Sequence, residues 1–354
     1  MHWFMYKDGK LYAEDVLLSD IAMRYGTPVY VYSRRTLERH IRAIDNAFKD
    51  IDHLTCYSVK ANSNGAILRL FSEYGMGADI VSGGELYRAL RAGIPANRIV
   101  FSGVGKTEKE IKYALESGIL MFNAESESEL ETINRIAGEM NCKAPLSFRV
   151  NPDIDPKTHP YISTGLKENK FGIPYTDVLR LYEKAAGMEN IDVIGIDAHI
   201  GSQLLDVLPF KESAERLMEL IKEIRERGID IKIIDIGGGL GINYEQDEPP
   251  DPEDWANMIV PVIKDSGCRL IVEPGRSITG NAGILLTRVL YIKSGEDKTF
   301  IIVDAGMNDL ARPSLYGSYH AVVPVIERKK ERRVVDIVGP ICESGDFIAK
   351  DREL

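Results

Sequence analysis

Short apolar runs rich in β-branched residues alternate with longer amphipathic stretches between about residue 54 and residue 275. Eight such runs occur: LTCYSVK, ADIVSG, IVFSG, MFNAES, LSFRVN, GIDAHIG, IIDIGGG and RLIVEPG. The stretches between them, such as residues 84–94 and 209–228, repeat apolar residues three and four positions apart, as helices with one buried face do. Eight strands with intervening helices predict a (β/α)8 barrel, and a doubly wound open sheet is the alternative.

After Gly275 the pattern changes to apolar runs with no helical stretches between them. The runs TRVLYIKS, KTFIIVDAG, AVVPVIER and RVVDIVGP predict a separate β domain. The N-terminal segment, which includes the run VYVYS, is expected to join it. We therefore divide the chain into an N-terminal segment of the β domain, a barrel and a C-terminal β domain, at residues 1–32, 33–275 and 276–354.

The longest connection between predicted strands runs from residue 151 to residue 195 and begins with a stretch rich in Pro, Lys, Asp and Thr. A connection of this length is usually functional or disordered.

Charge and cysteine usage narrow the class of protein. The chain has 44 basic and 54 acidic residues, a net charge of −10, so we expect no general affinity for nucleic acid or for an anionic membrane. Its four cysteines are scattered without the close pairs of a zinc site, which favours a reducing compartment and no metal. Charged residues interrupt the N-terminal apolar run, and no stretch approaches 18 apolar residues. We expect a cytoplasmic protein.

The ends of the predicted strands carry the candidate chemistry, because barrel enzymes place reactive groups at the carboxyl ends of their strands. Those ends hold Lys60, Asp79, His199, Ser202, the glycines at 237–239, Glu273, Gly275 and Arg276. Backbone N–H groups of glycines can approach a phosphate closely, and the loops after strands seven and eight are the usual phosphate site of this barrel. The pattern predicts an anion-binding site around a reactive lysine.

Each candidate also has a simpler interpretation. Lys60 could be a solvated surface lysine, and the three glycines a tight turn. His199 could be a packed core histidine, and Glu273 a salt-bridge partner of Arg276. The combination is more specific than its parts.

Seven segments extend the pattern into longer motifs: YSVKAN, GADIVSGGEL, HIGSQ, DIGGGLGI, EPGRSITG, RPSLYGSYH and CESGD. In this order they resemble the diaminopimelate decarboxylases, members of the alanine-racemase-like class of pyridoxal phosphate (PLP) enzymes that also holds ornithine and arginine decarboxylases. The likeness extends from Tyr25 to the last residue. It implies decarboxylation of meso-diaminopimelate to L-lysine.

The resemblance implies a role for each residue at the barrel mouth. Lys60 would hold PLP as a Schiff base, Glu273 would face the pyridine nitrogen, and His199 would stack on the ring. Asp79 would support the cofactor pocket. The phosphate would be surrounded by Ser202, Gly238, Gly239, Gly275 and Arg276.

The resemblance also implies roles for residues in the predicted β domain. Cys342 would donate a proton after decarboxylation, in the active site of the partner subunit, so that a homodimer shares its sites. A thiol has an ordinary pKa of about 8.5, which suits this role. Diaminopimelate has a second amino-acid head, whose carboxylate Arg276, Arg312 and Tyr316 could hold and whose ammonium Glu343 could hold. Arg312 and Glu343 could instead pair with each other on the surface.

One departure keeps alternatives open. The family normally continues several tens of residues beyond the equivalent of Asp346, with further strands and a tyrosine that touches cofactor and substrate, whereas this sequence stops at Leu354. We therefore expect a truncated β domain. The alternatives are a decarboxylase of ornithine, arginine or lysine, a non-catalytic regulatory binding protein derived from such an enzyme, and a racemase of the same fold class.

Overall fold

The computed structural model describes residues 2–154, 170–245, 247–296, 298–327 and 332–354. They form two compact units. The barrel unit comprises His40–Ile242 and Glu248–Thr279. The β unit comprises Met1–Arg39, Asn243–Asp247 and Gly280–Leu354. Residues 155–169, which belong to the predicted 151–195 connection, lie outside the described residues.

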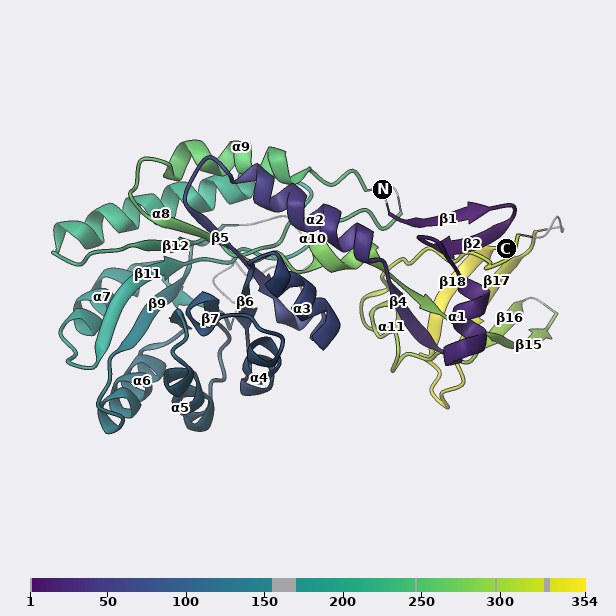
Figure 1. The fold of residues 1–354 in the computed structure, drawn as a ribbon, viewed down its shortest axis with the longest axis horizontal. Coiled ribbons are helices and arrows are strands. Elements are labelled where there is room, and N and C mark those ends of the chain that lie inside the picture. The colour runs from purple at the N-terminus through teal and green to yellow at the C-terminus, as the bar shows by residue number, and fades with distance from the viewer. Residues whose placement is uncertain (1, 155–169, 246, 297, 328–331) are drawn as a thin grey trace. The chain divides into compact units, whose positions relative to one another are not determined.

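Eight parallel strands close into a ring in the barrel unit (Figure 1). In chain order they are β5 (His53–Ser58), β6 (Gly77–Ile80), β7 (Ile99–Phe101), β8 (Met121–Ala124), β9 (Ala144–Asn151), β11 (Ile191–Asp197), β12 (Ile233–Asp235) and β13 (Arg269–Val272). The ring closes because β13 pairs with β5. A two-residue strand, β10 (Ile173–Pro174), adds to β9 outside the ring. The predicted barrel is confirmed, and the open-sheet alternative is wrong.

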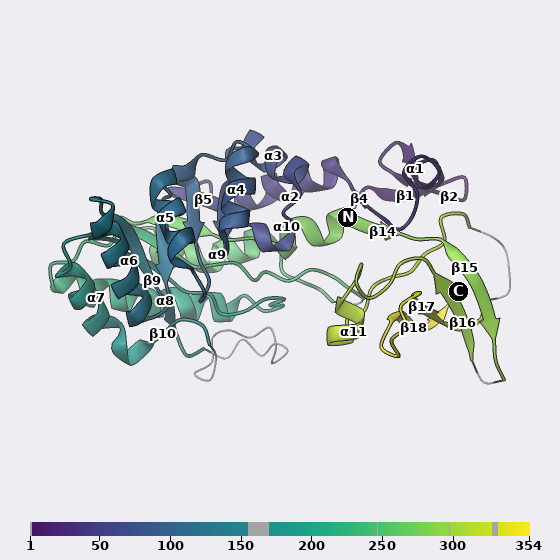
Figure 2. The same ribbon diagram turned by 90° about the horizontal axis from the view of Figure 1, so that it is seen from below.

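Helices surround these strands, as Figures 1 and 2 show. They are α2 (Arg34–Ala47), α3 (Gly65–Glu73), α4 (Gly83–Arg91), α5 (Glu108–Ser117), α6 (Glu127–Glu139), α7 (Val178–Ala186), α8 (Leu208–Glu226) and α9 (Pro252–Ile263). Polar residues after the strands start several of them: the Ser82 hydroxyl accepts from the Glu85 backbone N–H at α4, and Ser126 caps α6 in the same way. Each cap fixes where a strand ends and its loop begins.

The barrel interior is layered. Near the amino ends of the strands it is apolar, with a cluster formed by Leu54, Cys56, Val100, Met121, Ile233 and Ile271. Side chains of a strand alternate between faces, so positions two and four residues further on also point inward. At those positions the residues turn polar, as in the series Met121, Asn123 and Glu125 along β8 and its end. The carboxyl ends of the strands therefore form a buried polar layer.

The β unit contains three small sheets. The first is β1 (Phe4–Lys7), β2 (Lys10–Ala13) and β3 (Val16–Leu17), followed by the helix α1 (Leu18–Tyr25); the second pairs β4 (Val29–Tyr32) with β14 (Gly283–Leu286). The third is β15 (Val289–Ser294), β16 (Thr299–Val303), β17 (Val334–Val338) and β18 (Phe347–Glu353). The N-terminal run VYVYS supplies β4, within this unit as expected.

Two details of the predicted β domain are wrong. AVVPVIER forms no strand among its described residues, only an isolated bridge from Ile326 to Lys10. Pro324 lies in the middle of this run and has no N–H to donate to a ladder. The strands are also interrupted by a helix, α11 (Arg312–Tyr316), which begins with a proline in its first turn and ends at Gly317 in the left-handed conformation. At five residues it is too short to show a helical period.

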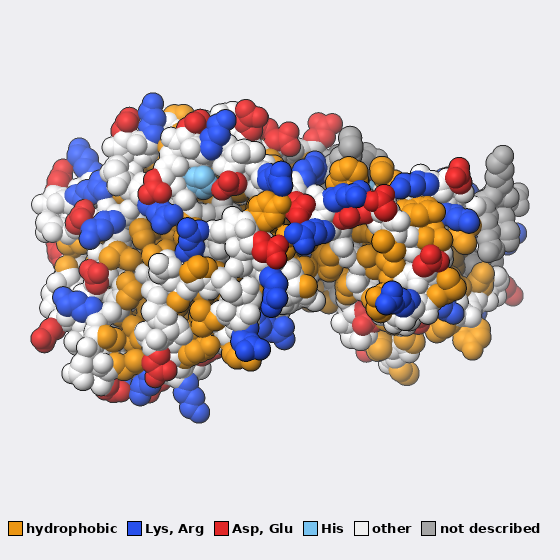
Figure 3. Space-filling model, viewed as in Figure 1, with side chains coloured by type: hydrophobic (Ala, Val, Ile, Leu, Met, Phe, Trp, Pro, Cys, Tyr) orange, Lys and Arg blue, Asp and Glu red, His pale blue; other side chains and the backbone are white. Residues whose placement is uncertain are grey.

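Exposed apolar side chains are unevenly divided. Among the described residues, 15 of the 21 large hydrophobic side chains that are exposed lie in the β unit, including Tyr291 and Ile292 on β15. Figure 3 shows orange apolar patches between charged side chains of both signs on the face viewed there. No helix among the described residues is long and apolar enough to cross a membrane.

Candidate active site

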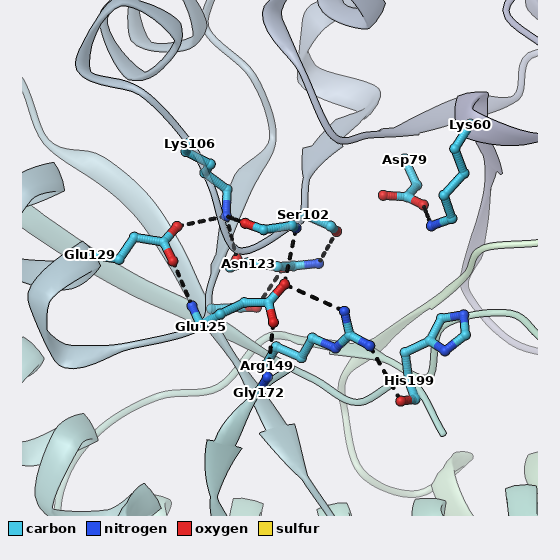
Figure 4. Close-up of polar contacts among 12 residues, drawn as sticks. Lys60, Asp79, Ser102, Lys106, Asn123, Glu125, Glu129, Arg149, Gly172 and His199 are labelled. Atoms are coloured by element: carbon cyan, nitrogen blue, oxygen red, sulfur yellow. Dashed lines mark hydrogen bonds and ion pairs between the residues drawn. The ribbon is translucent and has the colours of Figure 1, made fainter. Parts of the chain in front are cut away.

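Lys60 lies directly after β5, in the short 3-10 helix η1 (Val59–Ala61). Its Nζ donates to Oδ2 of Asp79 at 2.8 Å, and the same oxygen accepts from the Ser58 hydroxyl at 2.8 Å (Figure 4). Asp79 is fully buried, whereas the Lys60 side chain is 47% exposed. Burial lowers the pKa of Lys60, but the carboxylates of Asp79 and Glu273 raise it by more, so the net shift is upward. A buried carboxylate thus holds a charged, accessible amine at the barrel mouth.

Glu273 follows β13 and is buried, with an exposed fraction of 3%. Its Oε1 has no hydrogen-bond partner among the described residues. Burial raises the pKa of Glu273 well above its ordinary value, and the nearby Asp235 and Asp79 raise it further. A buried polar atom without a partner is uncommon in folded proteins. It marks a place where the donor group of a ligand would fit.

Three consecutive glycines follow β12, and the packing around them leaves no room for side chains. A Cβ on Gly238 would lie 2.1 Å from the Glu273 carbonyl oxygen. Gly239 has φ +119°, and a Cβ there would lie 2.4 Å from the Gly201 carbonyl oxygen. Glycine is therefore required at both positions, and backbone lies where side chains would otherwise project.

Arg276 and Ser202 meet beside this glycine loop. The Arg276 Nε and Nη2 donate to the Ser202 hydroxyl at 3.3 and 3.2 Å. Gly275 precedes the arginine, and a Cβ there would lie 3.0 Å from the Ser58 Cβ. The structure thus brings together residues that follow β11 and β13, the pair of strands on either side of β12.

His199 lies just beyond β11 and is held on both sides. Its Nδ1 accepts from the Gly201 N–H at 3.2 Å, and a Cβ on Gly237 would lie 2.8 Å from its Cδ2, so the ring packs closely against that glycine. Burial lowers the pKa of His199 well below its ordinary value, and the charges of Arg149 and Lys60 lower it further. The imidazole is therefore neutral at neutral pH.

Two more buried carboxyl groups, Asp197 and Asp235, lie in the same polar layer. Burial raises the pKa of Asp197 well above its ordinary value. Burial also raises the pKa of Asp235 to about 6, although the Gly237 N–H, Glu273 and Asn123 oppose the shift. The barrel mouth therefore retains protons on carboxyl groups at pH values where exposed carboxyl groups are ionised.

The sequence motifs missed a second polar cluster beside these residues. It comprises Lys106, Asn123, Glu125, Glu129 and Arg149, which Figure 4 shows joined by hydrogen bonds and ion pairs. The alternation along each strand could have found two of its members. Glu125 and Arg149 stand at inward positions, two residues after Asn123 on β8 and Ser147 on β9.

The remaining candidates lie in the β unit. Arg312 donates from Nη2 to the Ser318 hydroxyl at 3.1 Å, and its guanidinium lies over the rings of Tyr244 and Tyr316. Cys342 and Glu343 are both exposed, in the connection between β17 and β18. Cys342 is therefore not a buried core residue. The structure brings Arg312 and Tyr316 together. Cys342 and Glu343 are near each other simply because they are consecutive in the chain.

Known proteins are similar to this chain in sequence and in fold. Residues 34–280 match the family model for the pyridoxal binding domain of pyridoxal-dependent decarboxylases. The chain is 51% identical to a diaminopimelate decarboxylase of Aquifex aeolicus, covering 99% of this chain and 83% of the relative. A diaminopimelate decarboxylase of Vibrio cholerae is 50% identical, with 100% and 85% covered. The crystal structure of diaminopimelate decarboxylase from Helicobacter pylori complexed with L-lysine is similar at a TM-score of 0.92 and 44% identity, over 95% of this chain and 84% of that one.

Proposed function

The chain belongs to the diaminopimelate decarboxylases of the pyridoxal-dependent decarboxylase family, and we propose that it converts meso-diaminopimelate to L-lysine and carbon dioxide. The observation that carries this proposal is that one barrel mouth holds both the Lys60 amine, paired with Asp79, and a buried Glu273 oxygen that has no partner among the described residues. The choice of substrate is supported by the relatives that are similar to this chain over nearly its whole length.

Two features of the barrel mouth fit pyridoxal phosphate. The Glu273 Oε1 would accept from a protonated ring nitrogen, which would remove the cost of its missing hydrogen bond. The glycines at 238 and 239 leave backbone where a phosphate needs N–H groups, and Arg276 adds a fixed positive charge beside Ser202. Lys60, Glu273, Ser202, Gly238, Gly239, Gly275 and Arg276 would hold the cofactor.

When bound, pyridoxal phosphate supplies an electron-accepting ring, which takes up the electron pair left on the α-carbon when carbon dioxide departs. Lys60 would hold the cofactor through its amine, which must be deprotonated to react. Asp79, at 2.8 Å from that amine, holds the ammonium form whenever the amine is released. Glu273 in its ionised form would accept a hydrogen bond from the ring nitrogen and so favour a positively charged ring.

His199 contributes a flat and uncharged surface to the pocket. A neutral imidazole can stack on a positively charged ring without repulsion, and the Gly201 N–H fixes its orientation. This role follows from the family resemblance together with the downward pKa shift of His199.

The β unit supplies the residues that would select diaminopimelate. Arg312, half-buried and lying over two tyrosine rings, has the planar fork that suits a carboxylate, and Tyr316 lies beside it. With Arg276 they would hold the distal carboxylate, and Glu343 would hold the distal ammonium. Ornithine and lysine offer only an ammonium at that end.

We also propose a homodimer in which Cys342 of one subunit donates its proton at the Lys60 site of the other. Exposed apolar side chains concentrated in the β unit support an interface there. All four cysteines are free, which supports the expectation of a reducing, cytoplasmic environment.

Carbon dioxide release from a panel of amino acids tests the proposed function. The purified protein, loaded with pyridoxal phosphate, is expected to prefer meso-diaminopimelate to L-lysine, L-ornithine and L-arginine. Preference for one of the other three would replace the substrate assignment. Cofactor binding without release of carbon dioxide from any of them would favour the regulatory binding protein.

A further inference from the structure

Arg149 lies between the polar cluster and the residue proposed to stack on the cofactor. Its Nη1 is 3.4 Å from Glu125 Oε1, and its Nη2 donates to the backbone carbonyl of His199 at 3.5 Å (Figure 4). The guanidinium also lies over the Phe171 ring, 4.7 Å from its centre. Only 10% of the arginine side chain is exposed. One side chain from β9 therefore connects the end of β8 to the end of β11.

Glu125 is itself held at both oxygens. Oε1 accepts from the Gly103 N–H at 3.1 Å, and Oε2 accepts from the Gly172 N–H at 2.8 Å. Its backbone N–H donates to Glu129, which pairs with the buried amine of Lys106 at 2.6 Å. Buried groups with several charge-assisted hydrogen bonds hold one geometry. The carboxylate that orients Arg149 is thus fixed by the barrel.

The charges around His199 come from two neighbouring elements. Arg149 approaches from β9 and Lys60 from the end of β5, and both disfavour a protonated imidazole. Glu125 and Asp197 face Arg149, and burial of Asp197 keeps its pKa high, so it retains its proton and does not cancel the charge of the arginine. Arg149 is therefore placed to act on His199 through its backbone carbonyl and through its charge.

We propose that Arg149 is a positioning residue, which fixes the backbone of His199 at the end of β11 and adds a positive charge to the buried surroundings that disfavour a charged imidazole at the stacking position. The inference rests on the proposed function for the purpose of the stacking, but not for the state of the histidine. Glu125 acts one step further away, by holding Arg149 in place.

The test measures His199 directly, by nitrogen NMR of imidazole-labelled protein without cofactor. The chain has six histidines, and the His199 signal is identified by its loss in His199→Gln. In the unaltered protein His199 is expected to stay neutral at pH values where exposed histidines are already protonated, because burial holds its pKa well below the ordinary value of about 6.5. In Arg149→Met the histidine is expected to gain a proton at a higher pH, and Arg149→Lys is expected to restore much of the original behaviour.

Arg149→Met leaves Glu125 buried without its cation, which can prevent folding. The double variant Glu125→Gln/Arg149→Met removes both charges and avoids that cost. It is expected to shift the His199 titration in the same direction. Arg180→Met, which removes an exposed ion pair with Glu127, is the matched control and should leave the titration unchanged.

A His199 titration that is the same in the unaltered protein and in the folded double variant would overturn the proposal. In the cofactor-loaded enzyme, the double variant is expected to lower kcat by roughly tenfold to a hundredfold, as misplacement by about 1 Å does, and to move the acidic limb of the pH–rate profile to higher pH. Because the NMR measurement needs neither cofactor nor substrate, failure of this inference is distinguishable from failure of the proposed function.

Discussion

The pKa values of carboxyl groups removed from solvent shift in opposite directions in the two units. In the barrel unit, Asp197, Asp235 and Glu273 each have a buried oxygen without a hydrogen-bond partner among the described residues, and burial raises their pKa values. In the β unit, Asp304 accepts from Thr27, Thr287 and the Arg288 N–H, and Asp336 accepts from Lys298 and the Asp351 N–H. Burial acts to raise the pKa of both, but these partners lower it by more.

This contrast separates carboxyl groups that stabilise the fold from carboxyl groups that serve a site. Asp304 and Asp336 have their hydrogen bonds satisfied within the chain, so their ionised forms stabilise the β unit. The barrel carboxyl groups are only partly compensated in this way, and their burial costs stability. Such groups are found where they bind a ligand or transfer a proton.

The largest expected effect follows from removing the Lys60 amine at the barrel mouth. Lys60→Ala removes the amine that would carry the cofactor, and it is expected to lower kcat by on the order of a thousandfold or more. Borohydride reduction of the loaded, unaltered enzyme should place the pyridoxyl mass on the peptide containing Lys60. Lys112→Ala, which removes an exposed pair with Glu139, is the control and should retain activity. A reduced cofactor on another lysine would contradict the assignment.

Cys342 tests whether the β unit, besides its structural carboxyl groups, also supplies a group that reacts. Cys342→Ala is expected to lower kcat severely, because the proton donor after decarboxylation is lost. Mixing inactive Lys60→Ala and Cys342→Ala subunits should then restore activity, since one of the two shared sites in each heterodimer would hold both original residues. Verified heterodimers without any recovery would show that both residues serve the same subunit.

Arg312 tests whether the β unit selects the substrate. Arg312→Ala is expected to reduce turnover of meso-diaminopimelate by roughly a hundredfold or more, since removing one partner of a buried charge contact commonly costs about 3–5 kcal/mol. Residual turnover of lysine or ornithine should change much less, because neither has a distal carboxylate. Equal loss with all substrates would mean that Arg312 supports the fold of α11 and not recognition.

Asp235 allows a direct measurement of how much folding stability is lost when a carboxyl group is buried with only part of its hydrogen bonding satisfied. Burial raises its pKa to about 6 from an ordinary value near 3.8. Between these values the folded barrel binds a proton that the unfolded chain has lost, so stability falls as pH rises, by roughly 1.4 kcal/mol per pH unit and roughly 3 kcal/mol in all.

Asp235→Asn should therefore stabilise the cofactor-free barrel by up to about 3 kcal/mol at pH 7, and hardly change it at pH 4. Hydrogen exchange of the β12 and β13 amides measures this within the barrel unit. Asparagine retains an oxygen for the Gly237 N–H, which Asp235 accepts at 2.9 Å. Equal protection in the two proteins at pH 7 would contradict the interpretation.

The barrel could be predicted from sequence because each parallel strand is a continuous apolar run followed by an amphipathic helix. The grouping of Lys60 and Glu273 at one mouth of the barrel could be predicted because a motif extends beyond each of the two strand ends. Arg149 and Glu125 were missed because each stands singly in an ordinary strand, and only the closed ring brings β8, β9 and β11 to one mouth.

The β unit was harder to predict because its strands depend on distant partners. Phe347–Glu353 forms β18 by pairing with β17, but its sequence is strongly charged and shows little apolar alternation. AVVPVIER has a strand-like composition, yet Pro324 prevents a continuous ladder. Local propensity decides less in such small sheets than pairing and turn chemistry do.

The smallest expected effect applies the same substitution in the β unit and should give the opposite sign. Asp336 accepts from the Lys298 amine and the Asp351 N–H, both at 2.8 Å, and these partners hold its pKa below the ordinary 3.8 despite burial. Its ionised form therefore stabilises the fold above about pH 4, and that contribution is lost as the pH falls through the folded pKa. Asp336→Asn should weaken protection of the β17 and β18 amides at pH 7, equivalent to a Tm about 2–4 °C lower, and the difference should vanish in acid. Lys298→Met keeps the Asp351 contact and should have a smaller effect, since the amine is half exposed and solvent screens its charge. If Asp336→Asn instead stabilised the β unit as Asp235→Asn is expected to stabilise the barrel, burial alone would govern both carboxyl groups, and their hydrogen-bond partners would not distinguish a structural acid from a functional one.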